Sequence, residues 1–161
     1  MIPLACYVGA ILGYLVHLWR QGANINRREK LELAARWWLG AGGVWLLVSA
    51  AGHLFLADEV AESIGWETGS PFQREVGFAN LAFAVMGLLC IWVRGSFREA
   101  TVIGTAVFLW GAAGVHVYEI VEDGNFAPNN AGPILYLDIL GPLVGAIILI
   151  LLRRAERRRL P

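Results

Sequence analysis

The sequence predicts an all-α integral membrane protein, a polytopic transmembrane bundle of about five helices. Apolar residues make up 57% of its 161 residues and charged residues only 16%, and the mean hydropathy is +0.57. A soluble domain of this length cannot hide so much apolar surface in one core, so a lipid environment is the simpler explanation. The connections between the apolar stretches are short, which predicts a single integral membrane domain over residues 1–161.

Five apolar stretches have the length of a membrane-spanning helix, which needs about 20 residues to cross some 30 Å of hydrocarbon. We expect a four-helix core preceded by an N-terminal helix. The approximate spans are residues 2–19, 36–57, 71–93, 100–121 and 133–152.

Local signals indicate where some helices begin and which faces they bury. Ser70 and Gln73 have the spacing of a capping box with Pro71 at the first helical position, so the third helix is expected to start there. Pro133 is expected to open the fifth helix. Small and weakly polar residues recur at helical spacing on the third helix and favour close approach of a neighbour. This stripe is Gln73, Gly77, Asn80, Ala84 and Gly87.

The basic residues are sorted to one side of this topology. Twelve of the 13 lie between the first two helices, between the third and fourth, or after the fifth, and Arg74 is the exception. Lys and Arg accumulate in cytoplasmic loops, so we expect the N-terminus outside and the C-terminus in the cytoplasm, in a bacterial inner membrane. The basic C-terminal tail, including Arg158 and Arg159, is expected to rest on anionic lipid headgroups. The loops on the opposite side are acidic.

Five ionisable residues fall in the outer third of their helices, although those helices run in alternating directions. Ionisable groups at membrane depth are costly and usually face the bundle interior, a cavity or one another. Two of them, His116 and Glu119, are spaced i, i+3 and share a helix face. Glu75 lies off the stripe of its own helix, so its membership stays open. The expected cluster is His53, Glu75, His116, Glu119 and Asp138.

Three kinds of chemistry fit such a cluster. Two His and two or three carboxylates suit a transition metal, namely Zn, Fe, Mn or Cu. The same groups could form a proton-titrating site that serves a quinone, a lipid headgroup or a transported solute. The third interpretation is structural, with buried His–carboxylate pairs that lock four helices together. The sequence does not separate a functional site from a structural network.

Several function classes lose support because their motifs are missing. The sequence contains no phosphate-binding loop, dinucleotide fingerprint, His-Glu-x-x-His or Gly-x-Ser-x-Gly motif, and nothing in it suggests nucleic-acid binding. Five spans without an inverted repeat argue against a self-contained secondary transporter. Whether the protein is an enzyme stays open.

Certain strings resemble an uncharacterised family of bacterial multi-pass membrane proteins. They include SPFQREVG at residues 70–77, HVY at 116–118 and NFAPNNAG at 125–132, and the resemblance covers about three-quarters of the chain. In length and hydropathy that family is similar to the DoxX-like proteins, four-helix membrane bundles sometimes linked to quinone-dependent oxidation. The resemblance implies no activity, but it places the recognisable strings around Glu75, His116 and Asp138.

Two function classes therefore stand as hypotheses. In the first, the outer-facing cluster binds a metal ion or a small polar ligand. In the second, the protein is a non-catalytic structural or accessory subunit of a larger membrane complex, and the polar cluster serves helix packing. Either is compatible with a homo-oligomer.

Overall fold

The computed structural model describes residues 2–22 and 25–157, which fold into helices and connecting turns without a strand. Arg158 and Arg159, which belong to the basic tail expected to rest on lipid headgroups, lie outside the described residues. The helices are α1 (Ile2–Gln21), α2 (Arg27–Phe55), α3 (Ala57–Ile64), α4 (Phe72–Leu89), α5 (Ser96–Glu122) and α6 (Pro133–Arg157). The all-α prediction is thus confirmed for the described part of the chain, and each of the five predicted stretches contains one long helix.

Four of these helices, α1, α2, α5 and α6, are long and apolar enough to cross a membrane. Their outer surfaces are apolar: Ile103 and Val107 on α5 are 65% and 71% exposed. Such surfaces indicate contact with lipid. The fifth, α4, is not among the four, because its 18 residues include Gln73, Arg74 and Glu75 near its start. A count of five spans is therefore not confirmed.

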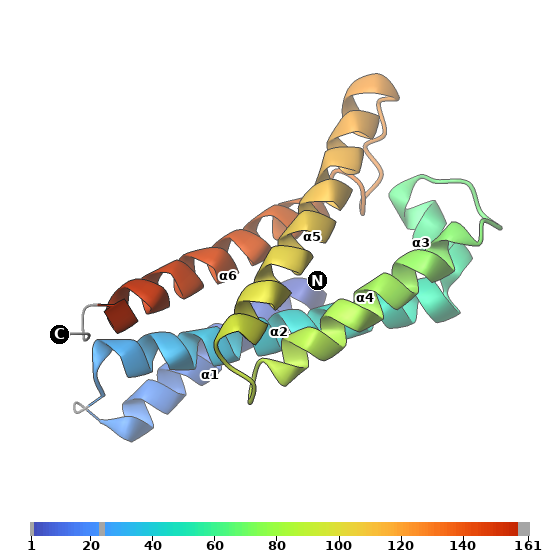
Figure 1. Cartoon of the computed structure of the whole chain (residues 1–161). Coiled ribbons are helices and arrows are strands. Elements are labelled where there is room, and N and C mark those ends of the chain that lie inside the picture. Colours follow the sequence, from blue (N-terminus) through green and yellow to red (C-terminus); the bar gives the residue numbers. More distant parts are fainter. Residues whose placement is uncertain (1, 23–24, 158–161) are drawn as a thin grey trace.

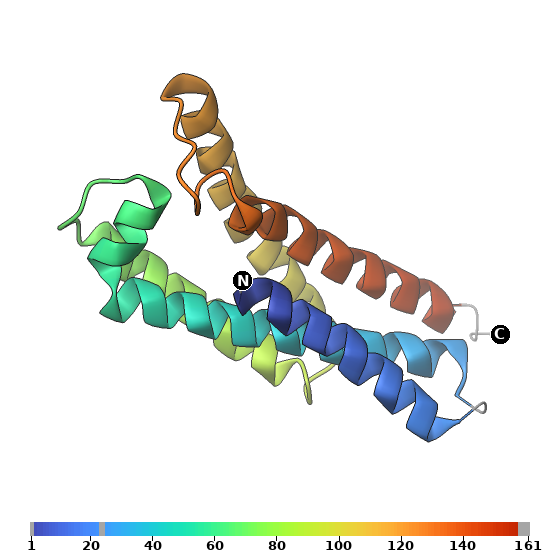
Figure 2. The ribbon, with the colours of Figure 1, turned by 180° about the vertical axis from the view of Figure 1, so that it is seen from behind.

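The connections gather at two ends of the bundle (Figure 1). The basic end comprises the α1–α2 connection, residues 90–95 and the end of α6. The acidic end comprises residues 56–71, which include α3, and residues 123–132 between α5 and α6. Figure 2 shows that α1 begins beside the middle of α2 and covers only the half of α2 nearer the basic end.

The starts of α2 and α4 differ from the expected ones, and α5 begins at Ser96, four residues before its predicted span. α2 begins at Arg27, nine residues before the predicted span, because Asn26 and Glu29 form a capping box. The capping box predicted at the start of α4 does not form: Ser70 Oγ accepts from the Phe72 amide, but the Gln73 side chain bonds elsewhere. The acidic stretch after α2 is a short helix rather than a loop, and Gly65, at φ +84°, ends it.

α4 packs along α2 more extensively than any other two helices pack together. The buried residues of α4 are the predicted stripe Gln73, Gly77, Asn80, Ala84 and Gly87, so that prediction is confirmed. At the closest point the helices meet glycine to glycine. A Cβ built on Gly43 would lie 2.6 Å from the Leu88 amide nitrogen, and one on Gly87 would lie 2.9 Å from the Gly43 Cα. The two backbones therefore touch, which only glycine permits.

The remaining helices close the bundle around α2. Leu46 of α2, Ala84 of α4 and Leu109 of α5 form one apolar cluster. A second, nearer the basic end, joins α2, α5 and α6 through Ala35, Val102, Leu149 and Leu152. The Trp38 indole Nε1 donates to the Gly141 carbonyl oxygen at 2.9 Å and ties α2 to α6.

A buried ion pair anchors the start of α5 at the basic end. The Arg98 side chain is 1% exposed; its Nη1 lies 2.8 Å from Glu32 Oε2 and its Nε donates to the Cys90 carbonyl oxygen at 2.9 Å. Arg94, 53% exposed, lies 3.8 Å from the same carboxylate oxygen. The sequence placed Arg98 only among basic residues outside the membrane, whereas it joins α5 to α2 and to the end of α4.

Candidate functional site

The first of the predicted cluster residues, His53, connects α2 to α4. Its Nδ1 lies 2.7 Å from Gln73 Oε1. An amide oxygen can only accept, so Nδ1 carries the proton in this pair. The acceptor is therefore a neutral amide on the buried stripe of α4, and not one of the predicted carboxylates.

His116, in the last third of α5, is paired with the loop that follows its own helix. Its Nδ1 donates to Asn130 Oδ1 at 2.6 Å, and both side chains are buried. The Asn130 amide is held in turn, because its Nδ2 donates to the Asn125 carbonyl oxygen at 2.7 Å. That donation fixes which end of the amide faces the histidine.

Glu119, one turn further along α5, accepts two hydrogen bonds at a single oxygen. Trp66 Nε1 donates to Glu119 Oε2 at 2.7 Å and Asn125 Nδ2 donates at 2.8 Å. Asn125 Nδ2 also reaches the Ile64 carbonyl oxygen at 2.9 Å. The carboxylate therefore links the end of α3 to the loop between α5 and α6.

These contacts form one structure, here called the acidic-end network: Trp66, His116, Glu119, Asn125 and Asn130. The Trp66 ring is central to it. The ring stacks on His116 with ring centroids 6.2 Å apart, and its other neighbour is Phe72, at 6.0 Å. The network thus joins the segment between α3 and α4 to the end of α5 and to the loop that follows it, with Trp66 and Glu119 separated by 53 residues in sequence.

The last two predicted residues stand apart from the network. Glu75, whose membership of the cluster was left open, is exposed on α4. Asp138 lies in α6, 6% exposed, and makes no hydrogen bond or ion pair with another described residue. His53 is held by Gln73 of α4, and His116 is held by Asn130 of the loop between α5 and α6.

The arrangement does not support a shared metal ion. Within residues 2–22 and 25–157 there is no group of three or more His, Cys, Asp and Glu side chains placed to hold one. His53 and His116 each donate Nδ1–H to an amide oxygen, and Glu119 accepts from two N–H donors at one carboxylate oxygen, so all three bond to groups outside the predicted cluster. The expected meeting of all five residues is therefore corrected: His116 and Glu119 share the acidic-end network, whereas His53, Glu75 and Asp138 lie outside it, and amides rather than carboxylates partner the histidines.

Sequence reasoning overlooked the amide partners, Gln73, Asn125 and Asn130. Asn125 and Asn130 lie in the string NFAPNNAG, which was noted only for its resemblance to the family, and Gln73 was assigned to a helix cap and to the stripe of α4. Charge singled out the ionisable members, whereas uncharged amides complete each pair. The signal that could have indicated this pairing was an asparagine in the short loop after the helix that carries His116.

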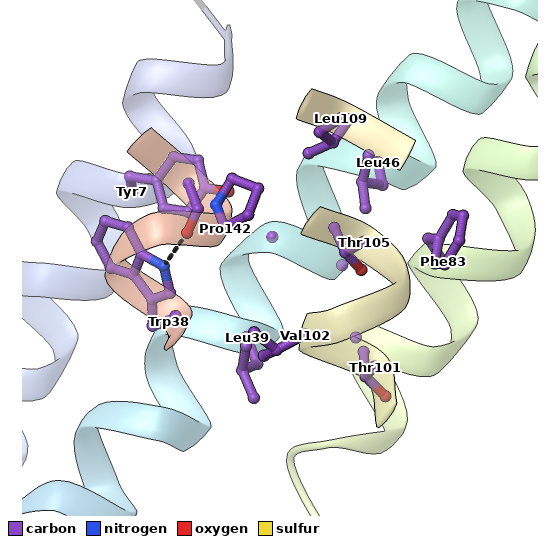
Figure 3. Close-up of a pocket in the computed structure, with 15 residues that line it drawn as sticks. Tyr7, Trp38, Leu39, Leu46, Phe83, Thr101, Val102, Thr105, Leu109 and Pro142 are labelled. Carbon is purple, nitrogen blue, oxygen red and sulfur yellow. Dashed lines mark hydrogen bonds between the residues drawn. The ribbon is translucent and has the colours of Figure 1, made fainter. Parts of the chain in front are cut away.

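A small cavity lies between α1, α2, α4, α5 and α6 (Figure 3). Its volume is about 40 Å³ and its walls include Tyr7, Trp38, Thr101 and Thr105. A space of this size holds a water molecule but no organic substrate. It lies on the basic-end side of the acidic-end network and shares no residue with it.

Comparison with known proteins places the chain without assigning an activity. No curated protein and no solved structure matches it. One family model does, over residues 1–158, which confirms the predicted membership of an uncharacterised family. With that match over nearly its whole length, the chain belongs to DUF6790, a family of unknown function.

Proposed function

We propose that the protein is a non-catalytic structural or accessory subunit of a larger membrane complex, and that its polar cluster fixes helix packing. The observation that carries this proposal is how the polar atoms are used. His53, His116 and Glu119 are each engaged by an uncharged side chain from another element. Buried polar groups that are satisfied in this way specify which elements meet.

The proposal includes a membrane arrangement. All five long helices, α4 among them, cross a bacterial cytoplasmic membrane, with the N-terminus outside and the C-terminus in the cytoplasm. Twelve of the 13 basic residues lie toward the proposed cytoplasmic side, and the charged Arg74 and Glu75 lie in the first turns of α4, within reach of the headgroups. The predicted similarity to DoxX-like proteins is not needed for this arrangement.

Cysteine labelling tests this orientation. In a chain whose two native cysteines are replaced by alanine, Asp58→Cys should react with an impermeant maleimide on intact cells. Arg94→Cys should react only after lysis. The reverse pattern would overturn the orientation, and labelling of both on intact cells would overturn the membrane crossing of α4.

A partner contact is proposed at the acidic end. Phe126 is 72% exposed in the loop between α5 and α6, next to Glu122 and Asp123. An aromatic ring outside the apolar helices gains nothing from lipid and favours a protein contact. Trp92, 71% exposed at the basic end, provides a matched control.

Extraction from native membranes in a mild detergent tests the accessory role. The chain should migrate in one assembly larger than itself, with a fixed stoichiometry. Phe126→Ser should release it from this assembly and Trp92→Ser should not. Elemental analysis of the same sample should find no stoichiometric metal. A free monomer would contradict the proposal. So would stoichiometric metal that is present in the wild type and absent from a His53→Ala/His116→Ala variant.

A second candidate is binding of a small polar ligand, and Asp138 is the observation that favours it. A buried carboxylate at membrane depth without a partner among the described residues is expensive to retain for packing alone. Thermal unfolding of the purified protein with Na⁺, K⁺ or ammonium would test this. A stabilisation that disappears in Asp138→Asn would support it, and no stabilisation by any of them would remove small cations as the ligand.

A further inference from the structure

A lipid-facing groove lies on α2 between α1 and α4. Both helices pack on α2 but, within the described residues, not on each other, so a strip of α2 stays uncovered. The groove has a volume of about 330 Å³, within the range of small-molecule sites. It is lined by Cys6, Gly9 and Ala10 of α1, by Arg36, Trp37, Gly40, Ala41 and Val44 of α2, and by Ile91 after α4.

Small residues keep this groove open. A Cβ built on Gly9 would meet no atom within 4 Å, so the space beside Gly9 is empty. A Cβ on Gly40 would lie 3.1 Å from the Ile91 side chain, which closes that side. The floor of the groove extends along α2 from Arg36 to Val44, a length of about 12 Å at 1.5 Å per residue.

One end of the groove is cationic. Arg36 is half-buried and makes no hydrogen bond or ion pair with another described residue. Its nearest acidic neighbour along the helix is Glu32, one turn away, and the carboxylate of Glu32 is already taken by Arg98. Four other arginines of the basic end, Arg28, Arg94, Arg98 and Arg153, are each paired with Glu32, Glu99 or Glu156.

We propose that this groove binds one acyl chain of an anionic phospholipid whose phosphate is held by Arg36. The orientation fits a lipid of the leaflet at the basic end: the cation lies toward that end, and the apolar floor runs from it toward the bundle centre. A guanidinium binds phosphate through two parallel hydrogen bonds, and a half-buried charge beside hydrocarbon needs such a partner. This site differs from the basic tail, which would attract anionic headgroups without a chain-binding groove.

Native mass spectrometry of the full chain in detergent tests the proposal, with phosphatidylglycerol and phosphatidylcholine of identical acyl chains as probes. The wild type should retain one phosphatidylglycerol in preference to phosphatidylcholine. Arg36→Gln should weaken phosphatidylglycerol binding about fivefold and abolish the preference. Gly9→Leu should lower retention of both lipids, because its side chain fills the groove.

Matched controls separate this site from general lipid adhesion. Gly111→Leu adds the same side chain at an exposed α5 position that is also open, and Arg154→Gln removes an exposed charge of α6. Both should bind phosphatidylglycerol as the wild type does. Equal losses in variants and controls, or unchanged binding in Arg36→Gln, would overturn the proposal. A dimer that is lost in Gly9→Leu would overturn it too, because the occupant would then be a second copy of the chain. Arg36→Gln breaks no internal bond among the described residues, so it remains a test if Gly9→Leu fails to fold.

Discussion

Replacing Arg98 with methionine should be one of the most damaging single changes at the basic end. The side chain is 1% exposed and holds Glu32 and the Cys90 carbonyl oxygen, both within 2.9 Å. Methionine fills most of the space but leaves the Glu32 carboxylate, 15% exposed, without its closest partner. Removing one member of a buried ion pair typically costs about 3–5 kcal/mol of unfolding free energy when the remaining charge is uncompensated. Arg28 and Arg94, 3.9 and 3.8 Å from the Glu32 carboxylate, offset part of this loss, so the lower end of that range is expected.

Arg94 supplies the control, because it faces the same carboxylate oxygen from 3.8 Å with a side chain 53% exposed. Exposed pairs of that kind contribute about 0–1 kcal/mol. Arg94→Met should therefore cost at least about 2 kcal/mol less than Arg98→Met. Unfolding free energies can be measured by denaturant titration in mixed micelles, with helicity followed by circular dichroism.

The double variant Glu32→Leu/Arg98→Met sharpens the comparison. With both charges replaced by apolar groups, it should be more stable than Arg98→Met alone, since no buried charge is left unpaired. Equal losses for Arg98→Met and Arg94→Met would refute the reasoning. A double variant less stable than either single variant would show that the loss comes from packing and not from charge.

Two further predictions concern the packed interior and the acidic end. Gly43→Ala should lower the unfolding free energy by about 1–3 kcal/mol, because its Cβ would lie 2.6 Å from the Leu88 backbone, whereas Gly111→Ala, in open space, should cost nothing. A Gly43→Ala chain with wild-type thermal stability would contradict the close approach of α2 and α4. Trp66→Phe should cost about 1.5–3 kcal/mol, since Glu119 loses a charge-assisted hydrogen bond of 2.7 Å while the ring is kept. No change in the thermal unfolding of that variant would show that this hydrogen bond does not stabilise the acidic end.

Much of the fold could be predicted because its signals are local. Apolar length alone located each long helix, and the glycine and alanine spacing on α4 identified the face that meets α2. α3 was missed because Ala57–Ile64 is too short and acidic to stand out, and its end depends on Gly65 at a positive φ. The early start of α2 was missed because hydropathy marks the membrane span and not the capped helix around it.

The site was predicted less well, because its partners are distant in sequence or uncharged. Arg98 looks like any basic loop residue until it is placed beside Glu32, which is 66 residues away. The ionisable members of the acidic-end network stood out by charge, but their depth alone could not show which side chains face them. The partners are amides, and an amide in a helix or a turn has ordinary local explanations.

The structural role proposed for the polar cluster depends most directly on the hydrogen bond between His116 and Asn130, which is 2.6 Å long and buried. A double-mutant cycle with His116→Ala and Asn130→Ala tests whether this hydrogen bond stabilises the fold. Denaturant unfolding is measured with and without a chelator. We expect a coupling free energy of about 1 kcal/mol, unchanged by the chelator. Additive effects within about 0.5 kcal/mol, or a coupling that appears only when Zn²⁺ is supplied, would contradict a structural role.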